Sequence, residues 1–214
     1  MGTGSDIQRA YGIHAVLADG IARVAASVGA HPYDLANLIH FESGGTFAPT
    51  ARNNISGATG LIQFMPSTAR RLGTTTEALA RLSAIEQLPW VEKYLRSAGV
   101  SLPLNTPQKL YMAVFYPKAA AWPIDQPMPS NVRAWNPGID TPGDYIRWVN
   151  KKAKLPPSQG VAAAPMSAGD VVATTALDAR AWALRLPVWA YAALAFGVLL
   201  SLTGLAVVIR RGRT

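Results

Sequence analysis

The sequence contains no cysteine among its 214 residues. This absence excludes disulfide bonds and metal sites that are built on thiolates. Histidine is also scarce, and the three that occur (His14, His31 and His40) are too scattered for a zinc site. We expect each of them on a helix face or at the surface, and we expect the protein to need no metal and no cofactor.

Acidic side chains are fewer than basic ones, 12 against 20, which gives a formal net charge of +8. Five of the basic residues lie around one apolar segment near the end of the chain: Arg180, Arg185, Arg210, Arg211 and Arg213. Residues 1–179 are therefore only mildly basic, and they contain no long basic run. The high isoelectric point thus indicates residues that flank a membrane segment rather than a nucleic-acid-binding protein.

Charge is absent altogether from residues 187–209. As a helix with a rise of about 1.5 Å per residue, this segment would span roughly 34 Å, enough for a bilayer core of about 30 Å. Trp182, Trp189 and Tyr191 lie near one end, where interfacial aromatic residues belong. The alternative is a buried core helix, but little else in the chain could cover it on all sides. We predict a transmembrane helix at 185–210, which contacts lipid through 187–209, and a basic tail at 211–214.

The rest of the chain divides into two parts. Residues 1–150 predict a compact, mainly α domain, and residues 151–184 are rich in Pro, Ala, Ser and Gly, which is typical of a tether. Within the domain we expect a first helix from Ser5 or Asp6 to a cap at Gly29, and others that begin at Pro32, Pro66, Pro107 and Pro142. The helix at Pro66 should stop at Gly73, and the last helix should end by Lys152. Capping boxes are expected at 74–77 and 83–86, with Pro89 kinking or restarting the helix.

The chemistry is concentrated around one acidic residue. Leu35, Leu38, Ile39 and Glu42 stand at i, i+3, i+4 and i+7, so a carboxylate completes the apolar stripe of a helix. Partial burial and the C-terminal end of the helix dipole should both raise the pKa of Glu42. A carboxylic acid that keeps its proton near neutral pH is what a glycosidase needs. The alternative is that Glu42 is a solvated residue at a fraying helix end.

Glycines stand on both sides of this acid, at Gly44, Gly45, Gly57 and Gly60. They allow tight turns and the close approach of a ligand to the backbone. Glu42-Ser43, followed by the segment from Gly57 to Ala69, resembles the soluble lytic transglycosylase family, which is related in fold to goose-type lysozyme. The two motifs occur in the family's order, with an insertion of a few residues around 50–55.

This resemblance implies a lysozyme-like fold and a role for each matching residue. Glu42 matches the sole catalytic acid and base, and Ser43 matches the serine that supports the site. Gln63 and Met65 match residues that line the groove beside the cleaved sugar, with Gly60 in the turn before them. Asn54 falls near a position where the family often has a polar residue close to the substrate's N-acetyl group.

The third motif of the family, usually Ala-Tyr-Asn-x-Gly, is altered in this chain. The comparable stretch is residues 112–119, where Tyr116 can supply the aromatic hydroxyl but the Asn and the Gly are missing. This variant looks more like phage-encoded members of the family, as does the stretch 135–140.

The resemblance implies cleavage between N-acetylmuramic acid and N-acetylglucosamine in peptidoglycan, with a 1,6-anhydro product. Most glycosidases need two carboxylates to add water, and between Asp34 and Glu77 the chain offers only Glu42. Asp125, Asp140 and Asp144 are the candidates for a second acid if the protein is instead a muramidase. A non-catalytic membrane protein that binds the wall or has a structural role is a third reading.

The location follows from the order of the segments. The first residues lack a charged start followed by an apolar stretch, so we expect no secretion signal. We expect a bacteriolytic virion protein in the internal membrane of a tectivirus-like phage, beside other virion membrane proteins, that opens the cell wall from the periplasm for genome entry. A tail-anchored bacterial enzyme is the alternative.

Overall fold

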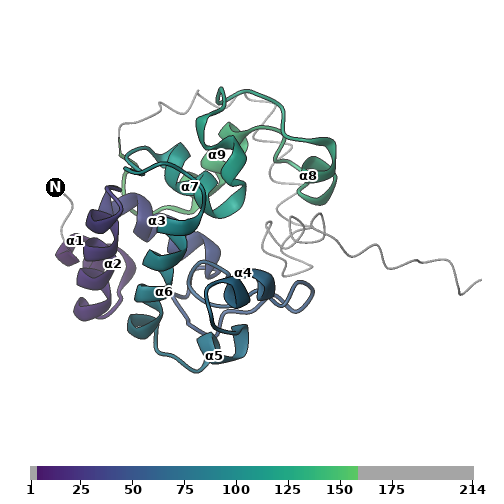
Figure 1. Ribbon diagram of the computed structural model, residues 1–214. Helices are drawn as coiled ribbons and strands as arrows, with labels where there is room; N and C mark the ends of the chain where they lie inside the picture. Colours follow the sequence, from purple (N-terminus) through teal and green to yellow (C-terminus); the bar gives the residue numbers. More distant parts are fainter. Residues whose placement is uncertain (1–3, 159–214) are drawn as a thin grey trace, which may run out of the picture.

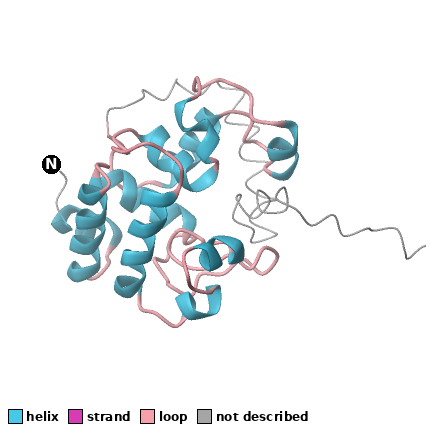
Figure 2. Cartoon of the chain, viewed as in Figure 1, coloured by secondary structure: helices cyan, strands magenta, loops and turns pink. Residues whose placement is uncertain are grey.

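The computed structural model describes residues 4–158, which form a mainly helical domain with no β-strand in that range (Figures 1 and 2). The predicted mainly α class is thus confirmed. The helices follow one another in this order: α1 (Gly4–Tyr11), α2 (Ala15–Ser27), α3 (Pro32–Glu42), α4 (Pro66–Arg71), α5 (Thr76–Ala80), α6 (Ala84–Ser97), α7 (Pro107–Phe115), the 3-10 helix η1 (Pro117–Ala121), α8 (Ser130–Trp135) and α9 (Pro142–Lys152).

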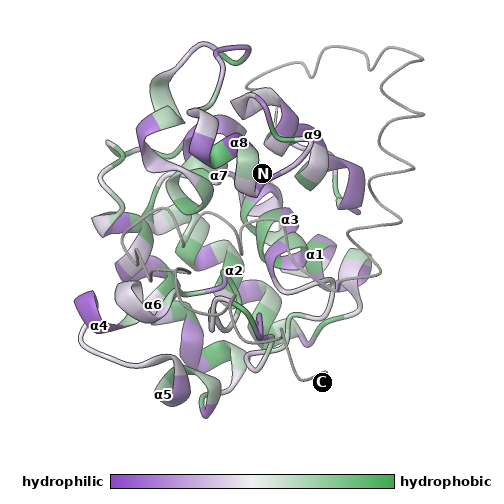
Figure 3. Ribbon diagram, turned by 90° about the vertical axis from the view of Figure 1, so that its right-hand side faces the viewer, coloured by the Kyte–Doolittle hydropathy of each residue, from purple (hydrophilic) through white to green (hydrophobic). Residues whose placement is uncertain are grey.

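The helix α3 lies at the centre of the domain. It packs against α1, α2, α7 and α9, while α2 and α7 also contact α6. In Figure 1, α8 and α9 lie toward one end of the domain and α4 and α5 toward the other. Figure 3 shows hydrophobic colour on the inner helices and hydrophilic colour along α4 at the edge. Because α3 is surrounded on several sides, it buries polar as well as apolar side chains.

Most of the predicted helix starts are confirmed. Pro32, Pro66, Pro107 and Pro142 each occupy the first turn of a helix, where a missing N–H costs no hydrogen bond. The predicted end of the last helix at Lys152 is also confirmed. Gly29 and Gly73 follow α2 and α4 with φ angles of +67° and +87°, a conformation that favours glycine at a helix end.

The prediction of one long first helix is wrong. Gly12, at φ +66°, ends α1, and the Nδ1 atom of His14 accepts a hydrogen bond from the N–H of Val16 to cap α2. The restart at Pro89 is also wrong, because α6 continues through it. The capping box at Ser83 is confirmed, but Thr75 rather than Thr74 caps α5. The short helices η1 and α8 were not predicted.

The domain extends beyond the predicted boundary at residue 150. The amide of Asn37 donates a 3.1 Å hydrogen bond to the carbonyl of Leu155, and the N–H of Ser158 donates a 2.9 Å bond to Asp34. Across residues 4–158, none of the helices combines the length and apolar character required to cross a membrane. The predicted transmembrane helix at 185–210, the basic tail and the tether from residue 159 onward lie outside the described residues.

Candidate active site

Glu42 is the last residue of α3. His31 caps the start of this helix through Nδ1, and Leu35, Leu38 and Ile39 are fully buried along one stripe of it. The stripe carries the Glu42 side chain into the interior, where the residue is 1% exposed. The alternative of a solvated residue at a frayed helix end is therefore wrong.

The two carboxyl oxygens of Glu42 have different surroundings. The hydroxyl of Tyr145 donates a hydrogen bond to Oε1. Oε2 is buried and has no hydrogen-bond partner among the described residues. Burial raises the pKa of Glu42 to about 8, although the bond from Tyr145 lowers it. Near neutral pH the group is thus mostly a carboxylic acid, and because Oε1 already accepts a bond, the proton belongs on Oε2.

Tyr145 is the partner that local sequence patterns did not single out. It is fully buried in α9, and its ring stacks on Phe115 with centroids 4.3 Å apart and meets the edge of Phe41. Burial and the neighbouring Glu42 raise the pKa of its hydroxyl well above the ordinary value, so it remains a donor. The only signal in the sequence was its place on the apolar face of the predicted helix, beside Ile146 and Val149.

Ser43 and the glycines after it form the turn that follows Glu42. The hydroxyl oxygen of Ser43 accepts a 2.9 Å hydrogen bond from the N–H of Phe47. Gly44 and Gly45 both have positive φ angles, and the N–H of Gly45 donates back to the carbonyl of His40 at 2.7 Å. Ser43 thus acts on the backbone beside Glu42 and not on the carboxyl group.

The glycine-rich motif forms a turn that holds Gln63. The Nε2 atom of Gln63 donates to the carbonyls of Ala51 and Gly60, at 2.9 and 2.8 Å. Two acceptors fix the orientation of this amide, so its oxygen Oε1 is left buried without a hydrogen-bond partner in the described residues. Gln63 itself has a φ of +55°, which is uncommon for a residue with a side chain. A strained residue with a free acceptor is typical of a ligand-binding position.

Asn54, the residue predicted near the N-acetyl group, is exposed. Its neighbour Asn53 is 2% exposed, and its Oδ1 accepts hydrogen bonds from the N–H groups of Ile55 and Ser56. Its Nδ2 is buried and makes no hydrogen bond to any residue in the described range. Of these two asparagines, Asn53 is therefore the buried one.

Met65 and Tyr116 lie at helix ends, Met65 before α4 and Tyr116 after α7. Met65 is partly buried and directly precedes α4. Tyr116 follows α7, is half-buried, and meets the edge of Trp122 with centroids 5.8 Å apart. Its neighbour Phe115 stacks on Tyr145, which places Tyr116 one residue from the side chains around Glu42.

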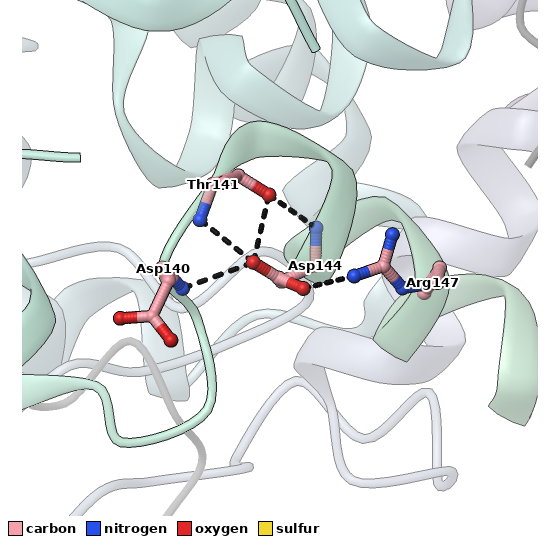
Figure 4. Close-up of polar contacts among 4 residues, drawn as sticks. All are labelled: Asp140, Thr141, Asp144 and Arg147. Carbon is pink, nitrogen blue, oxygen red and sulfur yellow. Dashed lines mark hydrogen bonds and ion pairs between the residues drawn. The ribbon is translucent and has the colours of Figure 1, made fainter. Parts of the chain in front are cut away.

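The aspartates considered as a second acid have other surroundings. Asp144 forms a capping box with Thr141, the N-cap residue of α9. Its Oδ2 accepts hydrogen bonds from the N–H groups of Asp140 and Thr141 and from the Thr141 hydroxyl, and its Oδ1 pairs with Arg147 (Figure 4). The carboxylate of Asp140 lies 3.8 Å from Arg133 with its side chain 67% exposed. Asp125 is exposed. Neither Asp125 nor Asp140 is buried as Glu42 is. Asp144 accepts four hydrogen bonds, three at Oδ2 and one from Arg147 at Oδ1.

Within residues 4–158, no group of three or more His, Cys, Asp or Glu side chains is arranged to hold a metal ion. Comparison of the chain with protein-family models, with curated proteins and with solved structures finds no match.

Proposed function

We propose that this protein is a peptidoglycan lytic transglycosylase with a lysozyme-like fold, and that Glu42 is its single catalytic acid and base. The observation that carries the proposal is the carboxyl group of Glu42. It is buried, has a pKa of about 8, is held at Oε1 by Tyr145 and has an Oε2 with no hydrogen-bond partner within residues 4–158. This is the state of a proton donor that is ready at neutral pH.

In the first step, the proton on Oε2 of Glu42 passes to the oxygen between N-acetylmuramic acid and N-acetylglucosamine. The bond from that oxygen to C1 of the muramic acid breaks, and the substrate's own N-acetyl group stabilises the positive centre. Glu42 becomes a carboxylate, and the hydrogen bond from Tyr145 strengthens because its acceptor gains charge. Tyr145 therefore favours the transition state over the ground state.

In the second step, the Glu42 carboxylate takes the proton from the C6 hydroxyl, whose oxygen then bonds to C1 and closes a 1,6-anhydro ring. The hydroxyl belongs to the same sugar, so its effective concentration is high. Glu42 regains its proton, and no second carboxylate is required. The contacts of Asp144 as a helix cap fit this scheme better than a role in activating water.

The substrate would bind beside the turn that carries Gln63. We propose that Oε1 of Gln63 and Nδ2 of Asn53, both buried without hydrogen-bond partners in the described part of the chain, accept from and donate to the glycan. Tyr116 and Met65 would add contacts from the ends of α7 and α4. Because Glu42 is 1% exposed, substrate binding must also uncover Oε2.

We further propose that residues 187–209 anchor the domain in a membrane, on the basis of their length and lack of charge. A phage virion with an internal membrane is the location that we propose, with the enzyme acting on the wall from the periplasm. Fractionation tests this point: recovery from purified virion membranes supports it, and recovery only from host inner membranes contradicts it.

The activity is tested with full-length protein in mild detergent and purified peptidoglycan. Mass spectrometry of the released fragments compares the wild type with Glu42→Gln, which keeps the shape but removes the proton donor. Glu92→Gln is the control, because Glu92 is paired with Arg96 at the surface. We expect anhydro fragments from the wild type and the control and none from Glu42→Gln. Fragments with ordinary reducing ends would indicate a muramidase, and no release from the wild type would contradict an enzymatic function.

A further inference from the structure

Gln87, in α6, is fully buried, and its side-chain amide makes three hydrogen bonds to the backbone. Its Oε1 accepts a 3.0 Å bond from the N–H of Leu61. Its Nε2 donates 2.8 Å bonds to the carbonyls of Pro49 and Leu79. One side chain of α6 thus joins two points of the segment between α3 and α4, Pro49 and Leu61, to α5.

The amide of Gln87 also explains the glycine at position 60. A Cβ atom on Gly60 would lie 2.5 Å from Oε1 of Gln87, closer than real Cβ contacts come. Gly60 also has a φ of +90°, which disfavours any other residue. The backbone of the loop can approach the amide this closely only because position 60 lacks a side chain.

The turn held by Gln87 is the one that fixes Gln63. Leu61 bonds to Gln87, while the carbonyl of Gly60 accepts bonds from both the backbone N–H and the Nε2 of Gln63, at 3.1 and 2.8 Å. The turn 60–63 therefore fixes the direction of Oε1 of Gln63. The position of that turn is itself fixed by the hydrogen bond to Gln87 of α6. A side chain whose hydrogen bonds lock the backbone of a binding turn preorganises that turn for its ligand.

We propose that Gln87 is a positioning residue for glycan binding: it holds the turn 60–63 so that Gln63 can meet the sugar. The inference rests on the proposed function. It predicts that loss of the Gln87 amide weakens glycan binding more than an equally destabilising change elsewhere does. Without the amide, the turn must be ordered when the ligand binds, and this ordering costs binding free energy.

The test compares Gln87→Met, which keeps the shape and removes all three hydrogen bonds, with Asn37→Leu as a matched control. Asn37 is also a fully buried amide, but it bonds to Tyr11 and to the carbonyl of Leu155 and not to the turn 60–63. Both changes are made in full-length protein in detergent, alone and together with Glu42→Gln. Calorimetry with chitotetraose gives the dissociation constant in the Glu42→Gln background, peptidoglycan release gives kcat/KM, and hydrogen exchange follows the Leu61 amide.

For Gln87→Met we expect a dissociation constant at least fivefold higher, a kcat/KM at least tenfold lower, and Leu61 exchange at least tenfold faster. For Asn37→Leu we expect less than a twofold change in binding and in Leu61 exchange, at a similar melting temperature. If Gln87→Met does not fold, Gln87→Asn, which withdraws the amide by one methylene, should shift binding in the same direction by at least twofold.

Two results would overturn the inference in distinguishable ways. If the wild type cleaves peptidoglycan and Gln87→Met binds and cleaves like Asn37→Leu, then Gln87 is only structural and the proposed function stands. If the wild type does not cleave and the Glu42→Gln protein does not bind the oligosaccharide, the proposed function fails and this inference fails with it.

Discussion

The buried proton of Glu42 should make the folded protein less stable as the pH rises. The pKa of this carboxyl is about 8 in the folded state against an ordinary value of 4.5, because burial disfavours the charged form. Between these two pH values the folded state holds a proton that the unfolded state has released. The stability that this group contributes is thus fully present below pH 4.5 and is lost as the pH rises through 8.

Replacement of Glu42 by Gln should remove this loss. Each pH unit within the window changes the free energy of unfolding by about 1.4 kcal/mol, so the wild type loses about 3 kcal/mol between pH 4.5 and pH 7. Gln has the same shape, carries no charge and still offers an oxygen to Tyr145. We expect Glu42→Gln to be about as stable as the wild type at pH 4, and more stable by roughly 3 kcal/mol at pH 7.

Urea unfolding of both proteins at pH 4, 5.5, 7 and 8, followed by tryptophan fluorescence, measures the difference. The control is Glu92→Gln. Hydrogen bonds from Ser27 and Arg96 lower the pKa of Glu92, so removal of its charge should not stabilise the protein at pH 7. A difference between wild type and Glu42→Gln that stays constant from pH 4 to pH 8 would refute the reasoning, since it would mean that Glu42 is ionised in the folded protein.

Three further predictions concern activity. Peptidoglycan release by the wild type should fall about tenfold per pH unit above pH 8, as Glu42 loses its proton; a rate that stays level to pH 10 would exclude Glu42 as the donor. Tyr145→Phe should slow release about tenfold and move this decline to higher pH, because the lost hydrogen bond favours the carboxylate; unchanged kinetics would show that Tyr145 only packs. Asp144→Ala should cost about 1 kcal/mol in urea unfolding, since it removes the Asp144 half of the capping box of α9, yet retain cleavage; loss of cleavage in a folded variant would make Asp144 the second acid of a hydrolase.

The helix starts could be predicted because the residues that fix them are adjacent in the sequence. Thr106-Pro107 and Thr141-Pro142 carry a capping side chain and a proline at the first turn, and both helices begin there. The break at Gly12 was missed because the apolar pattern continues across it. That break accompanies a distant contact, since the hydroxyl of Tyr11 donates to Asn37 and accepts from the N–H of Lys154, 143 residues along the chain.

The candidate site shows the same limit. The apolar stripe of α3 predicted an acid with a raised pKa at position 42, and the structure places Glu42 in the interior. Its partner Tyr145 lies 103 residues away, and no local pattern pairs two such residues. The burial of Asn53 and Gln87 is likewise marked by no local pattern, and for Gln87 it accompanies the packing of the loop against α6.

Digestion of peptidoglycan in water enriched in oxygen-18 tests the central claim most directly. If Glu42 acts alone and the C6 hydroxyl attacks C1, the muramic acid ends carry the 1,6-anhydro ring and acquire no oxygen-18. If water attacks, each new reducing end retains one oxygen-18 atom, and mass spectrometry detects the added mass. We predict unlabelled anhydro ends, all absent in Glu42→Gln; labelled ends would contradict the single-carboxylate mechanism.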